Sequence, residues 1–411
     1  MADSERERII RYLDQSFTEP VRDPVWGNIM FSRDFREIIS SPVLQKMNRI
    51  RQLGPTYLVY PGAVHTRFNH SLGVYHIGYR IIRQLLTFSV CPELSLDGVR
   101  GFLCACLLHD LGHFPYTHSL KELPLKEHEV LTGEYIMAEP LKSLIGRALE
   151  IDPYIPASIV DENLKTDSRE IHFFRNILSG VLDPDKLDYL TRDAWFCGVP
   201  YGTQDIDFVI SAIYPHPECG ISILPAGIPA VENILFSKYL MYRTVYWHKT
   251  VRCATGMIKK AIIRALDDGS LNPEQLYGLD DESLFQTCSG KLFRMVHERQ
   301  LYKMVSETVF DDSDPVHVSL MDLQRRSELE EKIVDDIRNQ GISCDDDSVF
   351  IDVPERINFE TSLPVFENGS FRTFSGSRGL GNFSRSLRML RVFAAPEVAE
   401  QLKKIKDIRW I

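Results

Sequence analysis

The chain has 411 residues, of which 44% are hydrophobic and 25% charged, and a formal net charge of −10. These values exclude a disordered, fibrous or very small protein, and the acidic balance does not indicate a protein that coats nucleic acid, although local basic patches leave nucleic-acid binding open. No apolar run approaches the roughly 20 residues of a bilayer-spanning helix, the amino terminus is charged, and the 8 cysteines form no CxxC pair, so we expect a cytoplasmic protein with no membrane partner.

Two segments in the first quarter of the chain predict helices. Apolar side chains recur at helical spacing from Asn69 to Leu86, and His70 falls on the buried face of this segment. A second helix is expected from Leu96 to Leu111, with Asp97 as its cap and Gly112 as its stop.

Two more helices are expected farther along the chain. The segment from Asp183 to Asp193 begins with Asp and Pro, as helices often do. A spacing of four residues places Asp185, Tyr189 and Asp193 on one face of it. The aromatic-rich segment from Ala230 to Leu266 predicts one long helix.

Strand signals are few. The segment Gly220–Leu224, followed by Pro-Ala-Gly, predicts a small hairpin, and Ser348–Val353 predicts a late strand. After Asp267 the composition becomes more acidic and loops become more frequent. We therefore expect a mainly α fold, with a helical core that carries the site over residues 1–267. Residues 268–411 are expected to form a helical and mixed α/β subdomain packed on this core.

Histidines concentrate around the second predicted helix. Of the 12 histidines, 7 lie between His65 and His128, which scattered surface positions would not produce. Imidazole and carboxylate groups suited to a metal are His70, His109, Asp110 and Asp185. Such ligands suit a divalent ion such as Fe, Mn, Zn or Mg, and a second ion is a further possibility. Any one of these histidines taken alone is better explained as a hydrogen-bonded core residue, and it is the four side chains together that indicate a metal site.

An ordered series of short motifs surrounds these residues. In chain order they are Gln52-Leu-Gly54, Tyr60-Pro-Gly-Ala63, His65-Thr-Arg-Phe-Asn-His-Ser-Leu-Gly73, His109-Asp-Leu-Gly-His113, His128-Glu129, Asp183-Pro-Asp-Lys-Leu-Asp-Tyr189 and Tyr246-Trp-His-Lys249. In this order they resemble the HD-domain metal phosphohydrolases, and more narrowly the deoxynucleoside triphosphate triphosphohydrolase branch that includes the SAM and HD domain-containing dNTPases. The resemblance spans Asp23 to Leu266 and implies an HD-domain helical core.

The resemblance implies a role for each matching side chain. The metal ligands would be His70, His109, Asp110 and Asp185. The scissile phosphate would be surrounded by the catalytic residues His113, His118 and His128, and either His113 or His128 would transfer the proton. The phosphate oxygens would be bound by Arg67 and Lys186. The sugar and base would be contacted by Gln52, Leu53, Tyr189, Asp193 and Tyr246, with Tyr246 closing off the 2′ position.

Three positions depart from the family pattern. Lys121 stands three residues after His118, where the family often has an acid, although Glu122 follows it. Phe114 stands where a glycine is common. Asn48 is the equivalent of an arginine found in nucleotide-activated members, so the resemblance does not imply a nucleotide activator here.

The resemblance implies hydrolysis of a deoxynucleoside triphosphate to the deoxynucleoside and triphosphate, through attack of water on the alpha phosphorus. Two alternatives remain open. One is an HD phosphohydrolase that acts on another phosphoester, such as a nucleoside monophosphate or a signalling nucleotide. The other is a scaffold with low activity that binds nucleotides or nucleic acid. The resemblance also implies a homo-oligomer, either a dimer or a tetramer.

Overall fold

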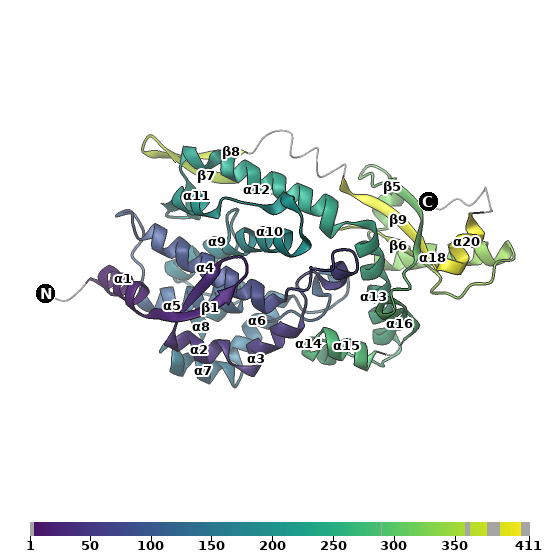
Figure 1. Cartoon of the computed structure of the whole chain (residues 1–411), viewed down its shortest axis with the longest axis horizontal. Coiled ribbons are helices and arrows are strands. Elements are labelled where there is room, and N and C mark those ends of the chain that lie inside the picture. The colour runs from purple at the N-terminus through teal and green to yellow at the C-terminus, as the bar shows by residue number, and fades with distance from the viewer. Residues whose placement is uncertain (1–3, 289, 358–361, 376–386, 404–411) are drawn as a thin grey trace.

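The computed structural model describes residues 4–288, 290–357, 362–375 and 387–403. Helices dominate these residues, together with small sheets of two, four and three strands, so the expected mainly α fold is confirmed (Figure 1). The molecule is elongated, with the N-terminal helices at one end and the C-terminal helices and strands at the other (Figure 1). None of the described helices combines the length and apolar character that crossing a bilayer requires.

Helices form most of the chain up to residue 211. The elements are α1 (Glu5–Gln15), β1 (Phe17–Asp23), β2 (Gly27–Ser32), α2 (Arg33–Ile39), α3 (Pro42–Gln45), η1 (Lys46–Arg49), η2 (Gly54–Leu58), α4 (Arg67–Leu85), α5 (Leu96–Leu108), η3 (Thr117–Leu120), α6 (His128–Met137), α7 (Leu141–Ala148), α8 (Tyr154–Val160), α9 (Arg169–Leu178), α10 (Pro184–Cys197), η4 (Pro200–Gly202) and α11 (Ile206–Ser211). The antiparallel pair β1 and β2 was not predicted from the sequence. Pro20 and the charged residues near it weaken the strand pattern of β1.

Helices α4, α5 and α10 form the centre of this bundle, since α4 packs against both of the others. The side chains of α5 from Gly101 to Leu108 are all buried, because this stretch contains no charged residue. A capping box between Thr66 and Asn69 starts α4. The carboxylate of Asp183 accepts the Lys186 amide and starts α10. These caps fix the first turns of α4 and α10, which carry two of the proposed metal ligands.

Helix α5 differs from its prediction at both ends. It is capped by Ser95, whose hydroxyl accepts a backbone amide, whereas Asp97 lies inside the first turn. It ends at Leu108, earlier than expected, because the amide three residues farther on bonds to the Leu108 carbonyl in a tight turn. His109 and Asp110 therefore lie in the turn that follows the helix.

The predicted strand near residue 220 is present, but its partner precedes it. The elements of this region are β3 (Ile213–His216), β4 (Gly220–Ile223), η5 (Pro225–Gly227), α12 (Ile228–Met241), η6 (Tyr242–Tyr246) and α13 (Lys249–Asp267). Strand β4 pairs in antiparallel fashion with β3, and the Pro-Ala-Gly that follows forms the short turn η5. The small hairpin is therefore confirmed with a different first strand.

The prediction of one long helix from Ala230 to Leu266 is wrong. The segment is divided by the π-helical turn η6, in which the amide of Trp247 bonds to the carbonyl of Tyr242. The next residue, His248, caps α13 through its ring nitrogen. Tyr246 therefore lies at the end of a π turn, where the helix breaks, and not in the middle of a regular helix.

The C-terminal region mixes helices with two groups of strands. Its elements are α14 (Pro273–Gly278), α15 (Asp281–Thr287), α16 (Lys291–His297), β5 (Lys303–Val309), α17 (Pro315–Ser319), α18 (Leu323–Asn339), β6 (Val349–Asp352), β7 (Ser362–Glu367), β8 (Ser370–Ser375), β9 (Met389–Ala394) and α20 (Pro396–Leu402). The late strand predicted at Ser348–Val353 is confirmed as β6, which pairs with β9, as β5 does. The hairpin β7–β8 returns to the first part of the molecule, where β7 lies parallel to β4 (Figure 1).

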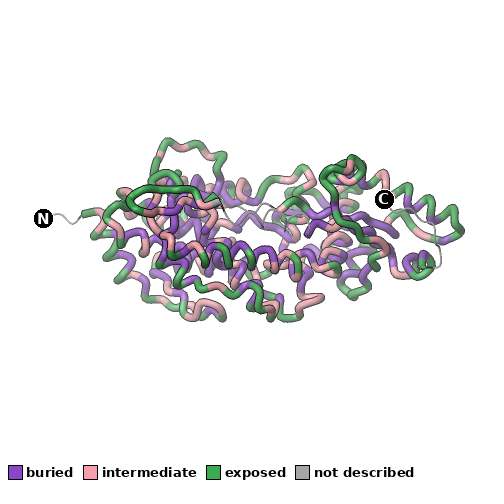
Figure 2. Tube along the Cα trace, turned by 90° about the horizontal axis from the view of Figure 1, so that it is seen from above, coloured by how far each residue is buried: buried purple, intermediate pink, exposed green. Residues whose placement is uncertain are grey.

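Buried residues run along most of the length of the molecule (Figure 2). The hydrophobic ones form two large clusters. The first cluster draws on the chain up to Val245 and on β7. The second draws on Cys253 to Leu402 and on residues near the turn after α5, namely Phe114, Leu120 and Leu131. Helix α13 thus packs with the C-terminal region. The division into 1–267 and 268–411 stays a prediction.

Candidate metal centre and active site

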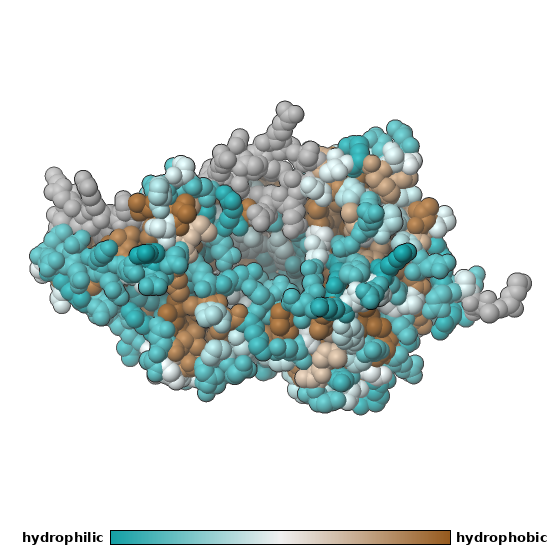
Figure 3. Space-filling model, turned by 180° about the vertical axis from the view of Figure 1, so that it is seen from behind, coloured by the Kyte–Doolittle hydropathy of each residue, from teal (hydrophilic) through white to brown (hydrophobic). Residues whose placement is uncertain are grey.

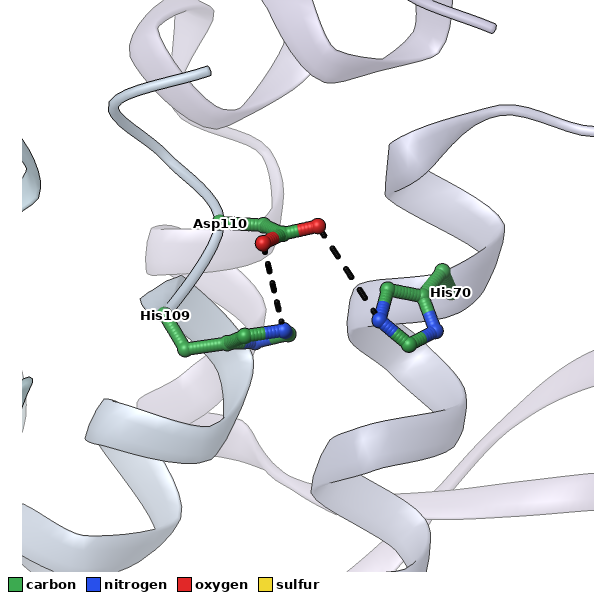
Figure 4. Close-up of side chains that lie close together, drawn as sticks. All are labelled: His70, His109 and Asp110. Carbon is green, nitrogen blue, oxygen red and sulfur yellow. Dashed lines mark ion pairs between the residues drawn. The ribbon is translucent and has the colours of Figure 1, made fainter. Parts of the chain in front are cut away.

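Asp110 lies between His70 of α4 and His109 at the end of α5 (Figure 4). Its Oδ1 is 3.4 Å from His109 Nε2, and its Oδ2 is 3.9 Å from His70 Nε2. The three side chains are at most 11% exposed. One ligand atom from each lies within 4.8 Å of the others, a spacing that allows them to share one ion.

Asp185, in the first turn of α10, completes the predicted ligand set. Its Oδ1 is 2.8 Å from His70 Nε2 and 3.8 Å from His109 Nε2. The side chain of Asp185 is 40% exposed, because it faces a pocket. The structure therefore brings together all four proposed ligands, which come from parts of the chain that are far apart in sequence.

The side chains present fit a divalent metal. His109 Nδ1 donates to the carbonyl of Cys106 at 3.0 Å, and its Nε2 is buried with no hydrogen-bond partner in the part of the chain that the structure describes. His70 Nδ1 donates to Asp188 at 2.8 Å, so its Nε2 points toward the neighbouring carboxylates. A buried nitrogen without a partner costs free energy. An ion between these nitrogens and oxygens would remove that cost, and the donor set accepts Fe, Mn, Zn or Mg.

The same contacts shift the pKa of His70. Burial alone would lower this pKa, but hydrogen bonds to Asp185 and Asp188 outweigh burial and raise it to about 10. The two carboxylates therefore favour a positive charge between them, which is the charge that a cation would supply.

A buried network of charged side chains bonds to the Nδ1 of His70 and was not predicted from the sequence. The carboxylate of Asp188 accepts hydrogen bonds from His70, from Arg192 at 2.8 and 2.9 Å, and from the indole of Trp26. Arg192 also donates to Asp23 at 2.7 Å. Carboxylates that hold a metal-binding histidine in this way fix its tautomer and orientation.

A signal for this network is visible in the sequence. Asp188 stands three residues after the proposed ligand of α10, and Arg192 stands four residues after Asp188, so these side chains are neighbours on a helix. Both are completely buried. Burial alone would raise the pKa of Asp188, but Arg192 and His70 hold it well below its ordinary range. What the sequence does not reveal is that this charged face lies inside the protein.

Arg67 and Lys186 were both predicted to bind phosphate, but only Arg67 is among the described residues that line the pocket. The guanidinium of Arg67 donates to Asp110 Oδ2 at 2.6 Å, and the side chain lines the pocket. The ammonium of Lys186 lies 3.2 Å from Asp183 and bonds to backbone carbonyls before α10. Among the described residues that line the pocket, Lys186 is absent. Its role in phosphate binding stays a prediction.

Three further histidines form a cluster beside Asp110, in which His118 contacts His113 and His128. His113 Nδ1 lies 3.2 Å from Asp110 Oδ1, and His113 Nε2 lies 3.1 Å from His118 Nε2. The ring centroids of His113 and His128 are 3.9 Å apart. Asp110, His113 and His128 also form a second group of close ligand atoms, as a second ion would need. His118 and His128 line the pocket, whereas His113 is buried behind them.

A pocket of about 820 Å³ opens over the metal centre. Its lining includes the residues predicted for sugar and base, namely Gln52, Leu53, Tyr189, Asp193 and Tyr246. Its far wall comes from α13, α18 and β6 of the C-terminal half. On the face of the molecule shown in Figure 3, hydrophilic residues predominate and apolar residues form separate patches.

The segment that carries Gln52 and Leu53 is fixed from two sides. The amide of Gln52 donates to the carbonyl of His65 at 3.0 Å. The amide of Arg51 donates to the carboxylate of Asp281 on α15 at 2.9 Å. Gln52 Oε1 is buried and has no hydrogen-bond partner among the described residues, so an acceptor is available for a ligand. Asp281, a residue of the C-terminal half, thus fixes the position of the segment that was predicted to contact the base.

Protonation of His128 is expected to destabilise the metal-free protein. Burial lowers the pKa of His128 to about 4, compared with about 6.5 in an unfolded chain. Because the folded state favours the neutral ring, this contribution to stability is complete above pH ~6.5 and is lost as the pH falls through about 4. Between these values, the Tm of the wild type in EDTA should fall more steeply than that of His128→Gln. Parallel pH profiles in scanning fluorimetry would contradict this expectation.

The turn after α5 requires a glycine at position 112. A Cβ atom there would lie 2.1 Å from the carbonyl oxygen of His128 and 2.7 Å from the amide nitrogen of Thr132. Both are backbone atoms of α6, so relief would need movement of that helix. We expect Gly112→Ala to lower the free energy of unfolding by about 1–3 kcal/mol and to reduce activity by displacing His128.

Urea denaturation checks the change in stability. The matched control is Gly146→Ala on α7, where the nearest atom to the added Cβ is 3.9 Å away. Since alanine favours helix over glycine, this control should be neutral or slightly stabilising. Equal unfolding free energies for the two variants would show that the turn tolerates a side chain.

Family models match two parts of the chain. Residues 67–151 match the HD domain, and residues 218–407 match the HD associated region. The first match contains three of the proposed ligands, His70, His109 and Asp110. The second covers α12, α13 and most of the C-terminal half, which supplies the far wall of the pocket.

Curated relatives come from archaea, bacteria and eukaryotes. An uncharacterized protein of Methanocaldococcus jannaschii is 33% identical over 302 residues, which are 72% of this chain and 61% of the relative. The protein YwfO of Bacillus subtilis is 35% identical over 245 residues, or 60% and 53% of the two chains. The human deoxynucleoside triphosphate triphosphohydrolase SAMHD1 is 26% identical over 349 residues, or 74% and 53%. The chain thus spans little more than half the length of these relatives.

Solved structures share the fold over nearly the whole chain. A hypothetical protein from Aquifex aeolicus has a TM-score of 0.73 and 25% identity, and the match covers 94% of this chain and 99% of that one. A phosphohydrolase from Bacteroides thetaiotaomicron has a TM-score of 0.72 and 22% identity, with 92% and 99% covered. With its HD domain followed by an HD-associated region, the chain belongs to the HD-domain superfamily.

Proposed function

We propose that the protein is a metal-dependent phosphohydrolase that converts a deoxynucleoside triphosphate to the deoxynucleoside and triphosphate. The observation that carries this proposal is one pocket that joins the face of the metal centre to side chains suited to a sugar and a base. The likeness to SAMHD1, whose name states this activity, supports the proposal.

The phosphate end of the pocket has the groups that such a reaction needs. A divalent metal held by the four proposed ligands would polarise a phosphoryl oxygen and lower the pKa of a bound water. The guanidinium of Arg67 would bind a phosphate oxygen and stabilise charge that develops during transfer. His128 and Glu129 line the pocket, and His128 Nδ1 lies 3.0 Å from Glu129 Oε2, so this carboxylate would orient the imidazole. The ring would then transfer a proton to the leaving oxygen of the deoxynucleoside.

The other end of the pocket would select the sugar and base. We assign the 3′-hydroxyl to Tyr189 and Asp193, and the closure of the 2′ position to Tyr246. The Tyr246 hydroxyl donates to Asp193 at 2.7 Å, so it has no free donor for a ribose 2′-hydroxyl. A pocket without room or a partner for a hydroxyl disfavours the ligand that carries one. Gln52 and Leu53 would contact the base.

The test is product identification. The protein is loaded with Mn or Fe and incubated with each dNTP, each NTP and nucleoside monophosphates, and the products are separated by anion exchange. We expect triphosphate and deoxynucleoside from dNTPs and no turnover in EDTA. Release of phosphate or pyrophosphate, or turnover of monophosphates alone, would select the alternative of another phosphoester. Nucleotide binding without turnover of any substrate would select the scaffold.

We also propose that the protein forms a homo-oligomer, as the resemblance implies. Light scattering coupled to gel filtration, with and without dNTP, would give the mass of the assembly. A mass of 47.2 kDa under both conditions would be that of a monomer. The cytoplasmic location and any binding of nucleic acid stay predictions.

A further inference from the structure

His65 lies directly behind the sugar end of the pocket, although it is not among the described residues that line it. Its side chain is completely buried and stacks on Phe196, with ring centroids 4.5 Å apart. Its Nε2 donates to Asp193 Oδ1 at 2.8 Å, and the hydroxyl of Tyr246 donates to Asp193 Oδ2 at 2.7 Å. The three side chains therefore form one hydrogen-bonded row, and Asp193 uses both of its oxygens in it.

The loop before His65 contacts α10 and η6, the two elements that supply the other side chains of this row. A Cβ atom at Gly62 would lie 2.4 Å from the carbonyl oxygen of Phe196, so the loop touches the backbone of α10. The hydroxyl of Tyr60 donates to the carbonyl of Thr244 at 2.7 Å, within the π turn η6. The aspartate and the tyrosine of the row project from these same two elements. The imidazole is thus held in place by contacts on both sides.

The backbone around His65 also reaches the other parts of the site. Its carbonyl accepts the amide of Gln52 at 3.0 Å, and the amide of Arg67 donates to the carbonyl of Ile50 at 2.9 Å. The segment assigned to the base and the start of α4 therefore meet at this point. Among the described residues, the His65 Nδ1 has no hydrogen-bond partner, so the ring is anchored by its Nε2 contact and its stacking.

We propose that His65 is a positioning residue that sets the preference of the site for deoxyribose by holding Asp193 against Tyr246. This inference rests on the proposed function, because it assumes that these side chains meet the sugar. With the Nε2–H donor in place, the carboxylate keeps one orientation and draws the Tyr246 hydroxyl toward itself. The phenol ring then faces the 2′ position, where a ribose hydroxyl finds no hydrogen-bond donor.

Without the imidazole donor, the buried carboxylate loses a charge-assisted hydrogen bond and is free to turn. Tyr246 then loses its fixed acceptor, and its hydroxyl is able to bond to a ribose 2′-hydroxyl. The expected consequence is a gain in binding of ribonucleotides with little change at the metal centre. Because one such bond is commonly worth a decade or more in binding, the deoxyribose preference should fall roughly 10-fold to 100-fold.

The test compares His65→Phe with His65→Gln. Phenylalanine keeps the stacking on Phe196 and removes the donor, whereas the amide nitrogen of glutamine reaches about as far as Nε2 and is able to donate again. The control is Val64→Ala, because the Val64 side chain is exposed and adjoins the same loop. Calorimetry with the α,β-imido analogues of dATP and ATP gives the ratio of the two dissociation constants without turnover. Metal content and Tm are measured on each variant.

We expect His65→Phe to lose the preference for the deoxyribose analogue, and His65→Gln to recover most of it, with metal content unchanged in both. An unchanged ratio in His65→Phe overturns the inference. So does an equal loss of both analogues together with a lower Tm, which is what a purely structural role predicts. A wild type that prefers the deoxyribose analogue but releases no triphosphate from dNTPs overturns the proposed function alone. A wild type without this preference overturns the inference alone if it still releases triphosphate from dNTPs.

Discussion

Replacing Asp110 with asparagine should abolish both metal binding and phosphohydrolase activity. This carboxylate accepts from Arg67 at 2.6 Å and lies 3.2 Å from His113 and 3.4 Å from His109. Burial alone would raise its pKa, but His113, His109 and Arg67 hold the pKa well below its usual range, so the group is an anion. Asparagine keeps the shape and removes the charge. Because Asp110 is a proposed ligand, metal affinity should fall by more than the roughly 10- to 100-fold that is typical when a residue hydrogen-bonded to a ligand is replaced.

Mass spectrometry of the bound metal and turnover of a dNTP check this result together. The matched control is Asp97→Asn, an exposed aspartate in the first turn of α5, the helix that precedes Asp110, and this variant should change neither quantity. Circular dichroism separates loss of metal from loss of fold. A folded Asp110→Asn protein that retains a full equivalent of metal would remove Asp110 from the ligand set.

Replacing Arg192 with leucine should give the largest loss of stability. Its guanidinium bonds to Asp188 and to Asp23, and all three side chains are at most 1% exposed. The substitution leaves two buried carboxylates without their cation, which commonly costs about 3–5 kcal/mol. Since Asp188 also holds His70, metal affinity should fall roughly 10- to 100-fold.

A double variant tests the pairing directly. Asp188→Asn combined with Arg192→Leu should be destabilised by less than the sum of the single variants, because each removes the other's partner. Urea denaturation supplies the free energies. The surface control is Arg325→Leu on α18, whose side chain is 68% exposed and whose ion pair should contribute little. Additive single effects would mean that the two buried groups do not stabilise each other.

The proposed ligands could be predicted because each lies in a short motif whose residue types suit a metal. His70, His109, Asp110 and Asp185 meet in the structure as their motifs imply. The sequence also shows Asp188 and Arg192 at helical spacing, but whether a charged helix face is buried depends on what packs against it. The role of Trp26 and Asp23 in that network depends on a contact made across more than 160 residues.

Local backbone features were predicted less well, for related reasons. The periodicity from Ala230 to Leu266 is helical throughout, yet a π turn at Tyr242–Tyr246 breaks it, and the last residue of that turn, Tyr246, bonds to Asp193. The orientation of Lys186 follows from the carbonyls at the start of α10, which no periodicity reveals. Residue types and spacing thus identify candidate chemistry, whereas tertiary contacts decide which side chains face the pocket.

The contact between Arg51 and Asp281 has a consequence for how the protein is made. The two residues are 230 positions apart, and a ribosome that adds about 5–20 residues per second needs roughly 10–50 s to span that interval. The proposed ligands and the residues behind them have all been synthesised by residue 192. A nascent chain therefore possesses its metal-binding side chains well before the segment with Gln52 is held in place. A metal ion that bound these side chains would thus stabilise the growing chain early, and the pocket beside them is completed last.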